Sequence, residues 1–249
     1  MLNYWKADAY RIVRSLSFWV LTLAAVVMYA AGIFILSGPS YSVGTHASVI
    51  VMIGVMASIF TGLGIYNTVY SQDIKAGAMR VAIGRGTGRT RVVIAKFLEM
   101  AVVAVIAGIV LYVVLLYFPA IFSIHVTSAL SSTASAAVWR FVLETILFSA
   151  LASIISMARQ ESVTATVVFV LLAAGVVDQL LGLLLSIGFI KNMVGDITGY
   201  LPQSLGATVG AQFSGTGEGG FSYVAVYVGY IVVSLVLSCW AFHRKELDF

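Results

Sequence analysis

The chain has 249 residues, of which 61% are hydrophobic and 10% are charged, whereas a soluble domain carries about 25% charged residues. With a mean hydropathy of +1.03, this composition excludes a soluble fold and predicts an all-α membrane protein. The net charge of +4 does not indicate a nucleic-acid partner, because the basic residues lie where the positive-inside rule for membrane proteins expects them.

The N-terminal stretch 1–15 is predicted to form an amphipathic helix on the membrane surface. Its apolar residues recur every three or four positions and share one face: Leu2, Trp5, Ala9, Ile12 and Leu16. Lys6, Arg11 and Arg14 lie off that face, where they can reach anionic lipid headgroups. A basic flank that only orients the first membrane span is the alternative.

Six apolar runs are long enough to cross a bilayer, since about 20 helical residues span its hydrocarbon core. They are predicted at 16–36, 47–70, 93–118, 138–158, 162–188 and 222–242, and together they form a single transmembrane domain. The fifth run is the longest, and we expect it to tilt or to break near Gly182 or Gly188.

Lysine and arginine residues determine the predicted orientation. With both termini inside, twelve of the fourteen basic residues face the cytoplasm, and only Arg140 and Lys191 fall on the outer side. The positive-inside rule therefore favours cytoplasmic termini. The segment 71–92 then becomes a basic, glycine-rich cytoplasmic loop, and 189–221 becomes the one long extracellular loop.

Small residues at every fourth position predict close helix packing in two spans. The second span carries Gly54, Ser58 and Gly62, which suit packing within the chain or across a dimer. The fifth span carries such a face through Asp178 and Gly182.

Ionisable residues inside apolar spans are costly and should face protein or water. Arg140 and Glu144 are four residues apart and can pair along one helix, and Asp178 is predicted at a similar depth. These three residues can form an intramembrane polar cluster that is either a structural ion pair or part of a substrate path. Glu99 is expected to pair with Lys96, three residues earlier.

Neither catalytic nor metal-binding motifs occur in the sequence, so we expect the chain not to be an enzyme by itself. The three histidines have no ligand spacing, and the single cysteine excludes a cysteine metal cluster. The run from Gly84 to Thr90 departs from a phosphate-binding loop at its first glycine and its lysine. No cofactor is expected in this chain.

The residues around the cytoplasmic loop carry a family resemblance. Five sequence features follow the second span in order. They are an acidic residue (Asp73), a glycine (Gly77), an apolar stretch, a Gly-x-x-Arg element (Gly86 and Arg89) and a lysine (Lys96). In this pattern the chain resembles permease subunits of bacterial type-2 ABC exporters, particularly the six-helix permeases linked to antimicrobial-peptide immunity and drug or peptide efflux. Ala78 and Gly88 depart from the threonine and serine usual in that family.

The resemblance implies a transporter in the bacterial plasma membrane whose permease and ATPase are separate subunits. The loop would dock on a separate cytoplasmic ABC ATPase that binds ATP and magnesium, and two permease chains, identical or paralogous, would form the path. The implied coupling residues are Asp73, Lys75, Gly77, Arg80, Gly86, Arg89 and Lys96, of which Arg80 and Arg89 are the favoured contacts. The substrate would be hydrophobic or amphipathic, such as a peptide, lipid or drug.

Two other functional classes remain open from the sequence. One is a small carrier or substrate-binding membrane subunit, which the scarcity of polar residues at mid-membrane disfavours. The other is a non-transporting membrane scaffold or sensor, which nucleotide-dependent transport would exclude.

Overall fold

The computed structural model describes residues 10–12, 14–36, 43–84, 86–121, 127–187, 195, 197–217 and 220–244, and these residues form helices and turns without a strand. The long helices are α2 (Leu16–Leu36), α3 (Val43–Tyr66), α6 (Arg89–Ile121), α7 (Ser128–Arg159) and α12 (Phe221–Arg244). The shorter elements are the π-helical turn η1 (Asn67–Ser71), α4 (Gln72–Lys75), α5 (Ala78–Gly84), α8 (Ser162–Ala173), α9 (Val176–Leu185), the 3₁₀ turn η2 (Thr198–Tyr200) and α11 (Pro202–Phe213).

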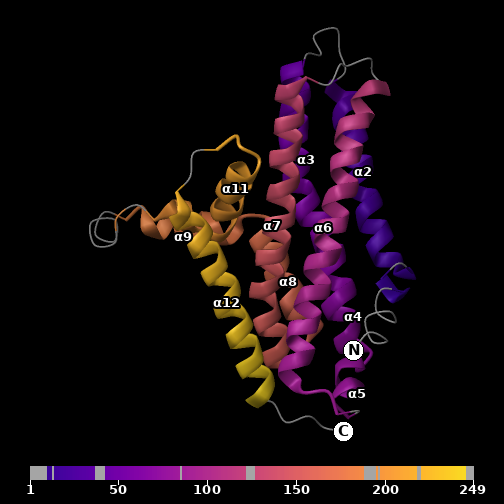
Figure 1. The fold of residues 1–249 in the computed structure, drawn as a ribbon, viewed down its shortest axis with the longest axis vertical. Coiled ribbons are helices and arrows are strands. Elements are labelled where there is room, and N and C mark those ends of the chain that lie inside the picture. Colours follow the sequence, from indigo (N-terminus) through magenta and orange to yellow (C-terminus); the bar gives the residue numbers. More distant parts are fainter. Residues whose placement is uncertain are drawn as a thin grey trace.

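Four helical stretches of the described chain are long and apolar enough to cross a membrane: Gly44–Lys75, Arg89–Tyr117, Ser128–Arg159 and Phe221–Arg244. The pair α8 and α9 makes a fifth if the two count as one broken span. Helix α2 covers the first predicted run, with Thr22–Gly32 as a shorter apolar stretch. The helices are thus compatible with a membrane-embedded protein. In Figure 1, α2, α3, α6 and α7 stand upright, and α5 lies at one end of this bundle, called the α5 end below.

Helix α7 is the centre of the bundle and packs against α3, α6, α8, α11 and α12. Its buried aromatic residue Phe148 meets Phe169 of α8 edge to face, and Phe169 stacks on Tyr66 of α3. Glycines permit the close crossings around it. A Cβ atom on Gly108 of α6, for example, would lie 2.5 Å from the Val142 side chain of α7.

The fourth span is longer than predicted, because α7 begins at Ser128 and not at 138. The Thr127 hydroxyl accepts a hydrogen bond from the Leu130 amide and caps the helix. The first turns are rich in Ser, Thr and Ala, and their hydroxyls bond to backbone carbonyls of the same helix, as Thr133 does to Ala129. Arg140 and Glu144 therefore lie in the middle of α7, not toward its end as the predicted boundaries implied.

The fifth span breaks at Gly175 and not near Gly182 or Gly188. Gly175 has a φ of +72°, and α8 and α9 meet there at a bend of 62°. A Cβ atom at this position would lie 2.2 Å from the Gln203 side chain of α11, so both the backbone conformation and the packing require glycine. Gly182 continues α9, and Gly188 lies outside the described residues. Helix α9 leaves the bundle sideways (Figure 1).

The predicted cytoplasmic loop is largely helical. After η1, helix α4 ends at Lys75, and α5 follows within a few residues. Gly77 and Gly86 lie at the two ends of α5 with φ angles of +65° and +87°, a region that only glycine enters freely. They allow the chain to reverse twice and enter α6 beside α3. Residues 72–88 are called the projection below.

Candidate functional site

A buried ion-pair network fixes the base of the projection. Asp73 of α4 pairs with both Arg11 and Lys96, and Lys96 Nζ lies 2.9 Å from the Glu99 carboxylate on α6. The Asp73 and Lys96 side chains are 0% exposed. The two acids balance the two bases, which buried charges require because an unbalanced charge away from water is strongly destabilising. The network joins the segment before α2, α4 and α6.

Hydrogen bonds extend this attachment to the π-helical turn. Arg11 Nη2 donates to the Thr68 carbonyl at 3.2 Å, and Gln72 Nε2 donates to the Ser15 hydroxyl at 3.0 Å. The Ser15 and Thr68 hydroxyls lie 3.3 Å apart. The chain entering α2 is therefore bound along the turn that leads from α3 into the projection.

Arg89 attaches the other end of the projection to α12. Its Nη1 donates to the carbonyls of Phe242 and His243 at 3.1 and 3.0 Å. These carbonyls belong to the last turn of α12, where helix carbonyls lack intrahelical partners and a positive charge is favourable. The projection thus follows α3 through η1, is ion-paired to α6 at Asp73, and enters α6 at a residue that is bonded to α12.

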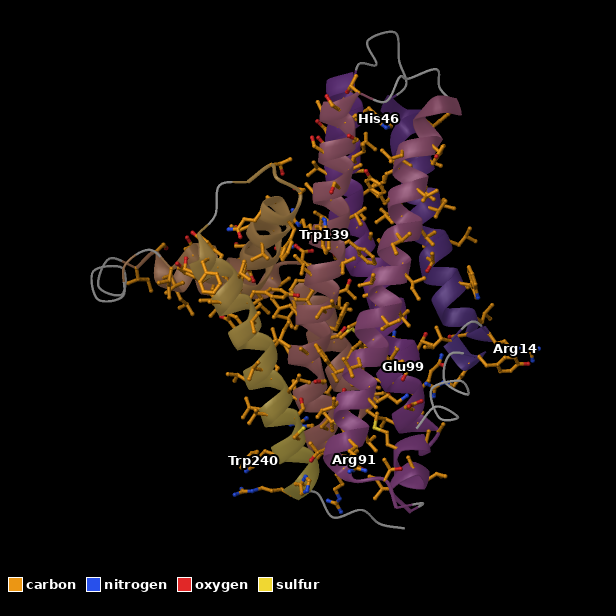
Figure 2. The ribbon with its side chains drawn as sticks, in the orientation of Figure 1. Arg14, His46, Arg91, Glu99, Trp139 and Trp240 are labelled. Atoms are coloured by element: carbon orange, nitrogen blue, oxygen red, sulfur yellow. The ribbon has the colours of Figure 1, made fainter. Side chains whose placement is uncertain are left out.

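The predicted coupling residues divide into anchors and surface. Asp73 and Lys96 are buried, and Gly77 and Gly86 form the turns. The exposed side chains near the projection include Lys75, Val81 and Arg91, called its outer face below. Arg80 belongs to α5, and its side chain is not among those described. In Figure 2, Glu99 lies in the half of the bundle nearest the α5 end, with Arg91 and Trp240 at that end and His46 at the other.

The three side chains predicted to form an intramembrane polar cluster gather around α11. Arg140 Nε lies 2.7 Å from Glu144 Oε1, so these two form an ion pair along α7. Asp178 of α9 instead accepts hydrogen bonds from the backbone amides of Gln203 and Ser204, both at 3.0 Å. Those amides open α11 and have no partner within that helix, so Asp178 acts as its N-cap from a neighbouring helix.

Two glycines that sequence reasoning placed in a loop bring α11 onto α7. A Cβ atom on Gly206 would lie 2.7 Å from Glu144 Cγ, and one on Gly210 would lie 2.9 Å from the Arg140 amide nitrogen. Gly206 and Gly210 are four residues apart, the same spacing that signals helix packing elsewhere. This spacing was the signal for a packed helix in 201–213. Asp178 therefore caps one short helix, whose glycines pack on α7 beside Arg140 and Glu144.

The small residues of the second span face α7 within the same chain. A Cβ atom on Gly54 would lie 3.0 Å from Ala137 Cβ, and one on Gly62 would lie 2.8 Å from the Thr145 hydroxyl. Ser58, between them, is fully buried. Gly182 differs, because nothing lies within 4 Å of a Cβ placed there.

The predicted surface helix 1–15 lies mostly outside the described residues, which begin at Tyr10 and omit residue 13. In the described part, Arg14 stacks over the Tyr10 ring at 4.5 Å from its centroid, and Ile12 is buried.

Among the described residues, no three His, Cys, Asp or Glu side chains are placed to hold a metal ion. Neither a protein-family model nor a curated protein sequence matches this chain.

Proposed function

We propose that this chain is the membrane-spanning permease subunit of an ATP-driven exporter of the bacterial type-2 ABC kind. In this proposal a separate cytoplasmic ATPase binds ATP and magnesium and docks on the projection. A second permease chain completes the transporter in the plasma membrane. The substrate is a hydrophobic or amphipathic peptide, lipid or drug that leaves the membrane or the cytoplasm.

The proposed topology has six spans, namely α2, α3, α6, α7, the broken pair α8–α9, and α12, with both termini inside and a surface helix before α2. The distribution of charge supports this orientation. Lys75, Arg89 and Arg91 lie in or beside the projection at the α5 end, and Arg244 closes α12 beside them. Under the positive-inside rule that end faces the cytoplasm.

The anchoring of the projection is the observation that carries the proposal. A docking element transmits force only if it moves together with the helices that it must displace, because a flexible loop would absorb the motion of the ATPase. Buried charges join the projection to α6, and Arg89, where the projection enters α6, is bonded to the end of α12. The outer face remains exposed for a partner.

This arrangement suggests distinct roles for the predicted coupling residues. Asp73, Lys96 and Arg89 hold the projection in place, and Gly77 and Gly86 shape it. The outer face, with the neighbouring Arg80, makes the contact. Its basic residues suit an acidic surface on the ATPase.

Co-purification from the native host tests the proposal. The tagged chain is extracted in mild detergent beside a Lys75→Glu/Arg91→Glu variant and a charge-conserving Lys75→Arg/Arg91→Lys control. We expect an ATPase to co-purify with the wild type and with the control, but not with the charge-reversed variant. The charge-reversed variant itself should still elute from the purification as a folded protein.

The alternatives give different results in this experiment. A carrier or a non-transporting scaffold would purify without an ATPase under several gentle conditions. A scaffold that binds an ATPase without transporting would retain the partner but show no nucleotide-dependent transport after reconstitution into vesicles.

A further inference from the structure

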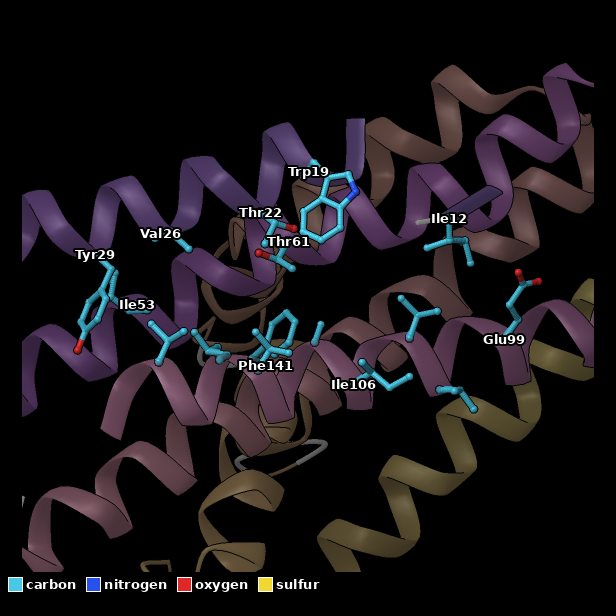
Figure 3. A pocket seen from close by; sticks show the side chains of 16 residues that line it. Ile12, Trp19, Thr22, Val26, Tyr29, Ile53, Thr61, Glu99, Ile106 and Phe141 are labelled. Atoms are coloured by element: carbon cyan, nitrogen blue, oxygen red, sulfur yellow. The ribbon is translucent and has the colours of Figure 1, made fainter. Parts of the chain in front are cut away.

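An apolar groove of about 390 Å³ runs between α2 and α6. Trp19, Thr22, Val26 and Tyr29 form its wall on α2, and Figure 3 shows them in this order along the groove. Ile53 and Thr61 contribute from α3. Ile12 and Glu99 lie together at one end of the groove in Figure 3, and Figure 2 places Glu99 in the half of the bundle nearest the α5 end.

The groove is long, narrow and open along one side. Its lining on α6 recurs every three or four residues from Glu99 to Val114, a rise of about 22 Å along a helix. Val102, Ile106 and Val110 on this stripe are 46%, 56% and 57% exposed. Side chains that line a groove and are still half exposed leave room for a slender apolar occupant.

Because Arg11 is already paired with Asp73, Arg14 is the exposed arginine that lies near the Glu99 end of the groove. Ile12, which lines it, is flanked by Arg11 and followed by the exposed Arg14. The one acidic lining residue, Glu99, is balanced by Lys96 at 2.9 Å, so its carboxylate does not repel an anion strongly. A phosphate at this level would meet Arg14, which can bind it through charge-assisted hydrogen bonds.

We propose that the groove binds one acyl chain of an anionic phospholipid, with its phosphate held by Arg14. One leaflet contributes about 15 Å of hydrocarbon, half of the 30 Å core, so a chain that enters at Arg14 lies along roughly two thirds of the groove. Bulk lipid is equally apolar, so the selectivity of the site comes from the phosphate contact and the fit. The site requires no ATPase. Loss of lipid binding and loss of ATPase docking can therefore be measured separately.

Photolabelling of the full chain tests this proposal. The purified protein is reconstituted into phosphatidylcholine vesicles that contain a trace of phosphatidylglycerol with a photoreactive diazirine in its acyl chain, and adducts are mapped by mass spectrometry. The probe should label the groove stripe, Val102, Ile106 and Val110, several times more than the neighbouring stripe, Val105, Ile109 and Val113. The second stripe is similarly exposed but does not line the groove.

Two pairs of variants locate the chain and the phosphate separately. Val102→Phe fills the groove and should abolish its labelling, whereas Val105→Phe, on a residue of nearly equal exposure, should leave it intact. Arg14→Gln should lower the preference for phosphatidylglycerol over an analogous phosphatidylcholine probe about fivefold. Arg244→Gln, which removes an arginine stacked in the same way on Trp240, should not.

Three results would overturn the proposal. Equal labelling of both stripes would mean that the groove holds only bulk lipid. Labelling of the groove stripe below its neighbour would mean that a second chain or a peptide covers it. Equal labelling by the two headgroup probes would remove the assigned phosphate contact. If Val102→Phe fails to elute as a folded protein, the comparison of stripes in the wild type and the Arg14→Gln variant still decide the matter.

Discussion

At the scale of single residues, an acid inside an apolar helix acquires a structural explanation. Asp178 is buried in α9 and accepts hydrogen bonds from the two amides that open α11. A carboxylate near a helix N-terminus is favoured both by the unsatisfied amides and by the helix dipole. Asp178 therefore fixes the position of α11 relative to α9.

Removing this cap should destabilise the chain. We expect Asp178→Ala to lower the free energy of unfolding in mild detergent by about 1–2 kcal/mol. Asp178→Asn should lower it less, because the amide oxygen still accepts hydrogen bonds. Denaturant titration followed by circular dichroism measures both. Gln179→Ala, an exposed neighbour, is the control, and an Asp178→Ala variant as stable as this control would refute the capping role.

At the scale of helices, glycines determine which elements cross closely. Gly54 and Gly62 bring α3 against α7, and Gly206 and Gly210 bring α11 against α7 from another direction. In a bilayer, where lipid competes equally for apolar surface, such close contact is the main source of helix association. The central position of α7 follows from these crossings.

A larger side chain at such a crossing should separate the helices. Gly62→Leu would place its Cβ 2.8 Å from the Thr145 hydroxyl, and we expect a loss of about 1–3 kcal/mol in unfolding free energy. Gly182→Leu introduces the same side chain where nothing lies within 4 Å, so it should be neutral. Equal stabilities for the two variants in a denaturant titration would contradict the α3–α7 crossing.

The helices and their small-residue faces could be predicted from the sequence. The helix boundaries, and the helices that those faces contact, were predicted less well. Hydrophobic length located the helices, and the charge pattern located the projection. A period of four residues does not say which helix it faces, so Gly54 and Gly62 left a dimer contact open. The break at Gly175 depends on Gln203 of α11, a contact between residues distant in sequence. Likewise, Asp73 stood out as the one acid in a basic loop, but its pairing with Arg11 required the fold.

At the scale of the whole molecule, the buried network joins the projection to α6 and to the segment before α2. Asp73 pairs with Arg11 and with the buried Lys96, which also pairs with Glu99. Removing one member of such a network leaves an uncompensated buried charge, which costs far more than an exposed ion pair. The base of the projection should therefore be among the sites most sensitive to charge changes.

A double-mutant cycle tests this sensitivity. Asp73→Asn should lower the free energy of unfolding by about 3–5 kcal/mol. Adding Lys96→Met should restore part of the loss, because the double variant leaves one base, Arg11, and one acid, Glu99. Lys75→Gln on the exposed surface should change stability by less than about 0.5 kcal/mol. Additive effects of Asp73→Asn and Lys96→Met would show that the network does not act as a unit.

Site-specific crosslinking in native membranes can show directly whether an ATPase docks on the projection. A photoreactive amino acid is placed at Val81 of α5, which is 54% exposed, or at Phe221, which is 85% exposed. Phe221 begins α12, at the end of that helix far from the projection. Docking of an ATPase on the projection predicts an ATPase adduct at Val81 and none at Phe221. The absence of an ATPase adduct at Val81, or an adduct at Phe221 instead, would contradict it.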